Sequence, residues 1–152
     1  MKLNFMLIDD NKFDLFINRK IIENASCDNR VRTFKNGQSA IKFLEVFEKK
    51  SKYHDTFLPN VILLDLNMPE MNGFQFLKEF KKLERIVEKP IKIYMLSSTT
   101  NFNDIIKIKN EKLCVGFISK PLTVEVLNKI MSESKPYANQ NYYQTNEVAN
   151  FY

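Results

Sequence analysis

Five strand-length apolar runs alternate along the chain with segments of helical period, and this alternation limits the possible folds more than any other feature. The runs lie at 3–8, 31–34, 61–64, 91–96 and 115–118. Each run precedes apolar side chains at helix-face spacing, such as Phe13, Phe16 and Ile17 after the first. Strict alternation of strands and helices predicts an α/β fold around a parallel sheet.

Turn residues and candidate helix caps separate these segments. Asn72-Gly73 predicts a turn into a third helix, and Pro90 ends that segment. The apolar face of the third helix is expected to contain Phe74, Leu77, Phe80 and Leu83. A fourth helix is expected over 101–109, and Thr123 has the side chain of an N-cap for the last helix.

The composition indicates one domain and excludes several classes of protein. The chain has 152 residues, 44% of them hydrophobic and 27% charged, which is enough for a self-sufficient core. No uncharged apolar run approaches the roughly 20 residues of a membrane helix, and no signal-peptide pattern is present. Two cysteines and one histidine are too few for a disulfide framework or a zinc site. We therefore expect a cytoplasmic protein without a membrane partner.

The charge distribution gives no sign of a nucleic-acid site. The net charge is +5, from 23 basic and 18 acidic residues. Basic residues lie among acidic ones, as in Lys78-Glu79 and Glu88-Lys89, which is typical of a solvated helix face. The sequence has no zinc-finger spacing and no RNA-binding signature. Direct DNA binding is not expected.

Two regions depart from the alternating pattern. Residues 135–152 are rich in Asn, Gln and Tyr and have no apolar helical face, so we interpret them as a tail on a domain of residues 1–134, with no output domain. Two alternatives stay open for this tail: it is loosely ordered, or its aromatic side chains dock on this domain or on a partner. The segments 48–59 and 85–90 are apparent insertions.

Chemically active side chains follow the carboxyl ends of the strands. They are Asp9, Asp10, Asp65, Ser97 and Lys120. Ligands of doubly wound parallel sheets bind at this edge, where the strand order reverses. Three adjacent carboxylates repel one another unless a cation lies between them, and their hard oxygen atoms suit Mg²⁺. A lysine and a hydroxyl beside them predict phosphate chemistry at a carboxylate.

Four sequence elements, in this order, resemble the receiver domain of two-component response regulators, and in particular a stand-alone, chemotaxis-regulator-like receiver. They are Asp9-Asp10, the run LDLNMPEMNG at 64–73, Ser97, and Lys120-Pro121. The resemblance extends from about residue 3 to residue 132. It implies a doubly wound five-stranded parallel sheet of the flavodoxin-like (βα)5 type, with strand order 2-1-3-4-5. It also implies a signalling protein that catalyses only its own phosphotransfer and dephosphorylation, not an enzyme with a separate substrate.

The resemblance assigns the phosphoacceptor and the metal ligands. Asp65 is similar to the family's phosphoacceptor, which takes a phosphoryl group from a phosphohistidine. Asp10 and Asp65 are expected to bind Mg²⁺ through their side chains, and Asn67 through its backbone carbonyl. Asp9 matches the acid that usually holds the metal through water.

The resemblance also assigns a switch. Lys120 is expected to pair with the phosphoryl group, and the Ser97 hydroxyl to turn toward it. Phe117 matches the aromatic residue that moves with this hydroxyl, although it can equally be core. Asn67 and Thr99 are expected to tune dephosphorylation.

The partners implied by the resemblance are proteins. A sensor histidine kinase or a histidine phosphotransfer protein is expected as phosphate donor, and a downstream protein as target. The phosphoryl group is expected to alter the face formed by the fourth helix, the fifth strand and the last helix, for partner binding or onward phosphorelay. We expect a monomer or a weak homodimer.

Three other functions were weighed against these residues. A receiver-fold interaction module that is not phosphorylated would have lost an acid or the lysine, and none is lost here. A phosphohydrolase of the haloacid dehalogenase type needs a second acid two residues after the nucleophile, where this chain has Asn67. A flavodoxin-type electron carrier shares the fold, but three acids oppose binding of the FMN phosphate without a metal.

Overall fold

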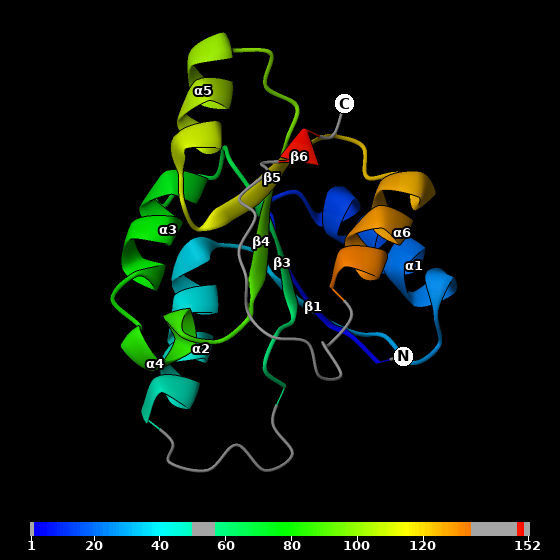
Figure 1. Cartoon of the computed structure of the whole chain (residues 1–152), viewed down its shortest axis with the longest axis horizontal. Coiled ribbons are helices and arrows are strands. Elements are labelled where there is room, and N and C mark those ends of the chain that lie inside the picture. The colour runs from blue at the N-terminus through cyan, green and yellow to red at the C-terminus, as the bar shows by residue number, and fades with distance from the viewer. Residues whose placement is uncertain (1, 50–56, 135–148, 151–152) are drawn as a thin grey trace.

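The computed structural model describes residues 2–49, 57–134 and 149–150, and in these ranges strands and helices alternate (Figure 1). The strands are β1 (Asn4–Ile8), β2 (Arg30–Phe34), β3 (Val61–Asp65), β4 (Lys92–Ser97), β5 (Cys114–Ser119) and β6 (Ala149–Asn150). The helices are α1 (Lys12–Ala25), α2 (Gly37–Lys49), α3 (Gly73–Phe80), α4 (Glu84–Val87), α5 (Phe102–Asn110) and α6 (Val124–Glu133). Most of the apparent insertion at 48–59 lies outside the described residues.

The strands form one parallel sheet in the order β2-β1-β3-β4-β5-β6. The first five strands confirm the predicted order 2-1-3-4-5. The sixth comes from the tail and was not predicted: Ala149 pairs with Gly116, and Asn150 with Phe117. The rest of the expected 135–152 tail lies outside the described residues.

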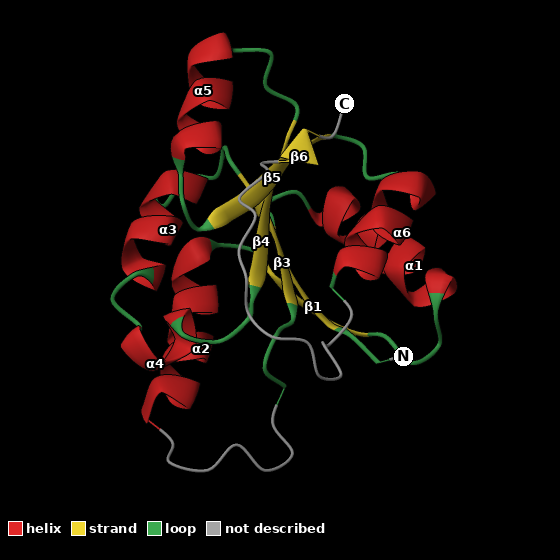
Figure 2. Ribbon diagram, viewed as in Figure 1, coloured by secondary structure: helices red, strands yellow, loops and turns green. Residues whose placement is uncertain are grey.

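Helices cover both faces of the sheet (Figure 2). One layer contains α1 and α6, whose buried Leu15, Ile22 and Leu127 pack with apolar residues of the strands. The other contains α2, α3, α4 and α5 and buries a second core around Leu44, Phe76 and other side chains. All five residues of β3 are buried, because a central parallel strand has helices on both sides. None of the described helices combines the length and apolar character that a membrane span needs.

The predicted third helix is interrupted, which corrects its expected apolar face. Helix α3 ends at Phe80, so Leu83 lies outside it, and the short α4 follows. The N–H of Leu83 donates to the carbonyl of Phe80 in the intervening turn, at 3.0 Å. Leu83 nevertheless packs in the same core, which explains why its spacing resembled a helix face. Glu48 caps α4, because its carboxylate accepts from the N–H groups of Arg85 and Ile86.

Side-chain caps define the starts of helices that follow the strand ends. Asn11 accepts from the N–H groups of Phe13 and Asp14 at the start of α1. Asn72 and Gln75 form a capping box at α3. The predicted cap at Thr123 is confirmed, because its hydroxyl accepts from the N–H of Val126, at 3.3 Å. These caps fix where the chain leaves the sheet edge and enters a helix.

Candidate functional site

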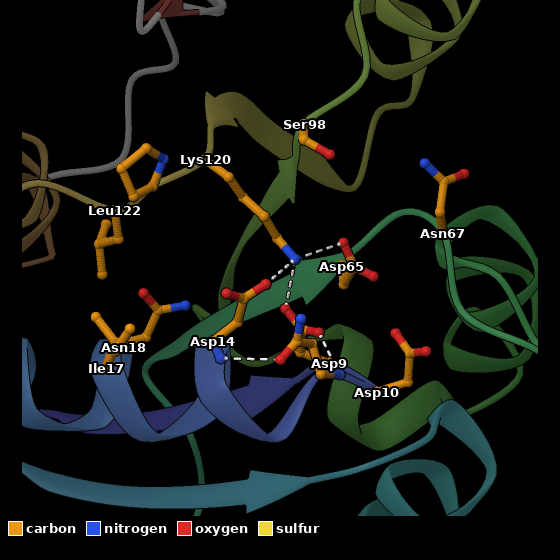
Figure 3. A pocket seen from close by; sticks show the side chains of 12 residues that line it. Asp9, Asp10, Asp14, Ile17, Asn18, Asp65, Asn67, Ser98, Lys120 and Leu122 are labelled. Atoms are coloured by element: carbon orange, nitrogen blue, oxygen red, sulfur yellow. Dashed lines mark hydrogen bonds and ion pairs between the residues drawn. The ribbon is translucent and has the colours of Figure 1, made fainter.

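A cavity of about 510 Å³ lies at the carboxyl ends of the strands (Figure 3). The structure brings together most of the predicted site residues around it. Those that line it are Asp9, Asp10, Asp65, Asn67 and Lys120. They come from the ends of β1, β3 and β5, so the convergence follows from the parallel sheet.

The three predicted acids form a compact cluster with unequal exposure. Oxygen atoms of Asp9, Asp10 and Asp65 lie within 4.8 Å of one another. Asp9 and Asp65 are 3% and 6% exposed, whereas Asp10 is exposed. The Asp9 carboxylate also accepts from the N–H of Asn11, at 2.8 Å, which fixes its position at the start of α1. The cluster therefore offers two fixed buried carboxylates and one that faces solvent.

The ammonium group of Lys120 lies among carboxylates from three elements (Figure 3). Its Nζ atom is 2.7 Å from Asp9 Oδ2, 2.9 Å from Asp14 Oδ2 and 3.1 Å from Asp65 Oδ1. Burial alone lowers the pKa of Lys120, but the surrounding carboxylates outweigh it and hold this pKa above its ordinary value. Lys120 is therefore a permanent cation at the centre of the site. Its peptide bond with Pro121 is cis.

Asp65 is held in an environment that disfavours its charge. Burial, followed by the negative charge of Asp9, raises the pKa of Asp65 from 3.8 to about 6, and Lys120 opposes part of this rise. At neutral pH the carboxylate is ionised but poorly solvated. A cation that enters the cavity would therefore stabilise the ionised form of Asp65.

The residues present fit a magnesium ion. Mg²⁺ binds oxygen atoms, commonly one or two carboxylates with water and phosphate oxygens completing the shell. The clustered oxygens of Asp9, Asp10 and Asp65 supply such ligands. Asp10 lies apart from the ion pairs of Lys120 in Figure 3 and faces the same cavity. A divalent cation there would relieve the repulsion between the three carboxylates.

The loop after β3 holds Asp65 at the rim of the cavity. The N–H of Gly73 donates to the carbonyl of Leu66, at 2.8 Å, and closes this loop. Glu70 takes a left-handed conformation within it, with φ of 66°. Met68 is buried while Asn67 is exposed and lines the cavity. Asn67 thus lies at the cavity, two residues after Asp65.

Three predicted residues do not line the cavity. Ser97 is 1% exposed, and its hydroxyl accepts from the N–H of Thr99, at 3.1 Å. The Thr99 hydroxyl donates a hydrogen bond to the Asp104 carboxylate, at 3.4 Å, in the first turn of α5. Phe117 is half-buried on β5 and packs against the core on the α5 side. Ser98 lines the cavity instead, and its small side chain leaves space beside Asp65.

The sequence analysis missed Asp14 and Asn18 of α1, which line the cavity one turn apart. Asp14 contacts Lys120, and Asn18 is 6% exposed. The available signal was the i, i+4 spacing of Asp14 and Asn18, which places both on one face of the helix that follows the acidic pair. That signal was weak because Lys120 is 106 positions from Asp14 in the sequence.

Comparison with known proteins agrees with this geometry. The response regulator receiver domain family matches residues 5–132. The probable methanogenesis regulatory protein FilR2 of Methanothrix harundinacea is 25% identical over 132 residues, which cover 87% of this chain and 81% of that protein. The response regulator receiver protein of Dyadobacter fermentans is 32% identical, with a TM-score of 0.73 and coverage of 90% and 99%.

A phosphorylated relative is also among the similar structures. The phosphorylated cyanobacterial phytochrome response regulator RcpA is 26% identical, with a TM-score of 0.66 and coverage of 88% of this chain and 91% of that one. The family match runs from the second residue of β1 through β5 and most of α6, and it includes every residue of the acid cluster. This chain therefore belongs to the response regulator receiver domain family, as its acid cluster, lysine and strand order indicate.

Proposed function

We propose that the chain acts as a response regulator, with its receiver at 1–134 and a tail at 135–152, in which Asp65 accepts a phosphoryl group. The observation that carries this proposal is the position of the Asp65 carboxylate. It borders an open cavity, 3.1 Å from the Lys120 ammonium and within 4.8 Å of the other two acids. Phosphoryl transfer depends on such positioning and on neutralising charge around the phosphorus atom.

The transfer forms one bond and breaks another. A carboxylate oxygen of Asp65 attacks the phosphorus of a phosphohistidine, a P–O bond forms, and the P–N bond breaks. The imidazole nitrogen keeps the electron pair of the broken bond, and Asp65 becomes an acyl phosphate. Lys120 would donate to the transferred oxygens. Asn67 has no carboxyl group with which to transfer a proton. The chain is therefore a phosphoacceptor and not a phosphohydrolase of the haloacid dehalogenase type.

Asp10 and Asp65 would hold Mg²⁺ through their carboxylates, Asn67 through its carbonyl, and Asp9 through water. When bound, the ion would neutralise the acid cluster and the phosphoryl oxygens. Two features of the chain itself would complete the site. The loop closed by Gly73 orients Asp65, and the Lys120 ammonium compensates the negative charge of the Asp65 carboxylate.

The response to the phosphoryl group would pass through Ser97 and Lys120. The N–H of Lys120 donates to the carbonyl of Ser97, at 3.0 Å, so the ends of β4 and β5 are already joined. The Ser97 hydroxyl would leave the N–H of Thr99 and donate to a phosphoryl oxygen. Thr99 adjoins α5, and Phe117 lies on β5, so the change would reach the α5–β5–α6 face. Phe117 would move with Ser97, and Asn67 and Thr99 would set the rate of dephosphorylation.

The proposed partners are proteins: a sensor histidine kinase or a phosphotransfer protein as donor, and a target that reads the α5–β5–α6 face. Exposed apolar side chains lie on α1, whose Ile17 and Asp14 line the cavity. They offer a donor a docking surface beside Asp65. We propose a cytoplasmic protein, monomeric or weakly dimeric, that binds neither DNA nor membranes.

Intact mass after incubation with acetyl phosphate tests the phosphoacceptor. Wild type with Mg²⁺ should gain one phosphoryl group, and wild type with a chelator should not. Asp65→Asn should gain none, while the exposed and distant Glu88→Gln should behave as wild type. If folded wild-type protein gains no phosphate from acetyl phosphate or from a histidine donor, the phosphoacceptor role is wrong, and a phosphorylation-independent interaction module takes its place.

A further inference from the structure

We propose that Asp14 is a positioning residue that competes with the phosphoryl group for the ammonium of Lys120. This inference rests on the proposed function, because it concerns the same lysine. Asp14 belongs to α1 and not to a strand end, and no role for it follows from the chemistry of the acid cluster. Its contact with Lys120, at 2.9 Å, is shorter than the contact between Lys120 and Asp65, at 3.1 Å.

Carboxylates already surround the donors of Lys120 in this arrangement. An ammonium group has three N–H donors. Three carboxylates surround it in Figure 3, and Asp9 and Asp14 both accept hydrogen bonds from it, at 2.7 and 2.9 Å. A phosphoryl group on Asp65 brings three strong acceptor oxygens. These oxygens would therefore compete with the present carboxylates for the donors of Lys120.

Asp14 is the partner that is easiest to release. The side chain of Asp9 is 4% exposed and that of Asp65 is 7% exposed, whereas that of Asp14 is 35% exposed. Asp9 is also fixed by the N–H of Asn11. A partly exposed carboxylate recovers hydration when it leaves an ion pair, so this contact breaks at a lower cost than a buried one.

The competition predicts whether loss of the Asp14 charge strengthens or weakens the phosphorylated state. While Asp14 holds Lys120, the unphosphorylated state is stabilised relative to the state in which Lys120 contacts the phosphoryl group. Removing the charge of Asp14 should therefore strengthen the phosphorylated state. A residue that merely orients Lys120 toward Asp65 would have the opposite effect when removed.

Beryllofluoride, a phosphoryl analogue that binds an aspartate carboxylate, allows an equilibrium test in the presence of saturating Mg²⁺. Asp14→Asn should bind it at least about threefold more tightly than wild type. Wild type must break the partly exposed ion pair between Asp14 and Lys120 when it binds the analogue, whereas Asp14→Asn has no such ion pair to break. Asp14→Glu, which keeps the charge, should stay near wild type, as should the distant Glu88→Gln. The phosphoryl group from acetyl phosphate should also last longer on Asp14→Asn.

The NMR signal of the Lys120 ammonium separates competition from a general effect of charge. Asp14→Asn should shift this signal in the free protein and leave it nearly unchanged in the beryllofluoride complex, where the contact is already broken. Equal or weaker beryllofluoride binding by Asp14→Asn, or an equal shift in both states, would overturn the proposal. Wild-type protein that neither binds beryllofluoride nor gains a phosphoryl group would instead overturn the phosphoacceptor role of Asp65.

Discussion

Gly73 packs against the backbone carbonyl of Asp65, and no side chain fits between them. A methyl group at position 73 would lie 3.0 Å from the Asp65 oxygen, 3.2 Å from Leu66 Cα and 2.7 Å from Met95 Sδ. The first two atoms belong to the backbone that carries the proposed phosphoacceptor. The residue that begins α3 therefore helps to fix the position of Asp65.

Gly73→Ala should lower the free energy of unfolding by about 1–3 kcal/mol, because overpacking against backbone cannot be relieved by a side-chain rotation. It should also slow phosphorylation by acetyl phosphate, since Asp65 must shift. Gly37→Ala is the matched control: the three atoms nearest to its new methyl group all belong to the flexible side chain of Met71. Its change in stability should stay within about 1 kcal/mol, since alanine also favours the helix. Urea denaturation followed by circular dichroism measures both, and equal losses in the two variants would contradict this account.

The sequence was sufficient for the first five strands, which are apolar runs, and for the acid cluster, whose members follow the ends of these runs. Parallel strands bring Asp9, Asp65 and Lys120 to one edge whatever their distance in the chain. The contact between Asp14 and Lys120 was not predictable, because it depends on which way the start of α1 faces Lys120. The break before α4 was hidden because Leu83 packs in the core at the spacing of a continuous helix.

No pattern in the sequence predicts the sixth strand, β6. Ala149–Asn150 has no alternating apolar pattern, and its pairing with β5 lies within a tail that reads as polar and aromatic. The residues expected to act as a switch are an intermediate case. The sequence placed Ser97 at the end of the fourth strand and Phe117 within the fifth, but it could not predict the hydrogen bond from the Thr99 N–H to the Ser97 hydroxyl.

Mg²⁺ should stabilise the wild-type protein through the acid cluster. A ligand at 100 times its Kd adds about 2.7 kcal/mol to the stability of the folded state. The thermal midpoint of wild type should therefore rise by several degrees. In Asp10→Asn the rise should fall below half, because the exposed carboxylate of the cluster is lost. Differential scanning calorimetry with and without a chelator measures this, with Glu88→Gln as control, and an undiminished rise in Asp10→Asn would exclude Asp10 as a ligand.

Asp65→Asn should stabilise the metal-free protein at pH 8. Burial and the charge of Asp9 raise the pKa of Asp65 from 3.8 to about 6, so the folded state binds this proton more tightly than the unfolded state. Stability contributed by the proton is present below pH 4 and is lost as the pH rises through 6. Asparagine carries no such penalty, and we expect a gain of about 1–2 kcal/mol at pH 8, allowing for solvent screening.

The gain should shrink toward pH 4, where Asp65 of the folded wild type is protonated and its ordinary pKa of 3.8 leaves it about half protonated in the unfolded state. Urea denaturation at the two pH values, with a chelator present, provides the comparison. Glu88→Gln should show no such pH-dependent difference, because the Glu88 side chain is exposed. An Asp65→Asn protein that is less stable than wild type at pH 8 would mean that Lys120 compensates the charge fully.

Docking of the phosphate donor on α1 can be separated from the chemistry at Asp65. Phe13, Phe16 and Ile17 are 79%, 61% and 50% exposed on this helix, and Ile17 lines the cavity. Phe16→Ala should slow transfer from a phosphorylated histidine phosphotransfer protein about fivefold or more, because aromatic anchors contribute strongly to interfaces. Its rate with acetyl phosphate should not change, because so small a donor does not need the surface of α1.

Phe102→Ala provides the matched control. Phe102 is 72% exposed on α5, on the opposite face of the sheet from α1, and its loss should leave transfer from the protein donor intact. The phosphotransfer protein must first be shown to phosphorylate wild type, and the rates then follow from rapid-quench sampling. Equal slowing by Phe16→Ala and Phe102→Ala would place the donor elsewhere. Slowing of the acetyl phosphate reaction by Phe16→Ala would instead mean that α1 positions Asp14 and Lys120, since Phe16 and Asp14 share the first half of that helix.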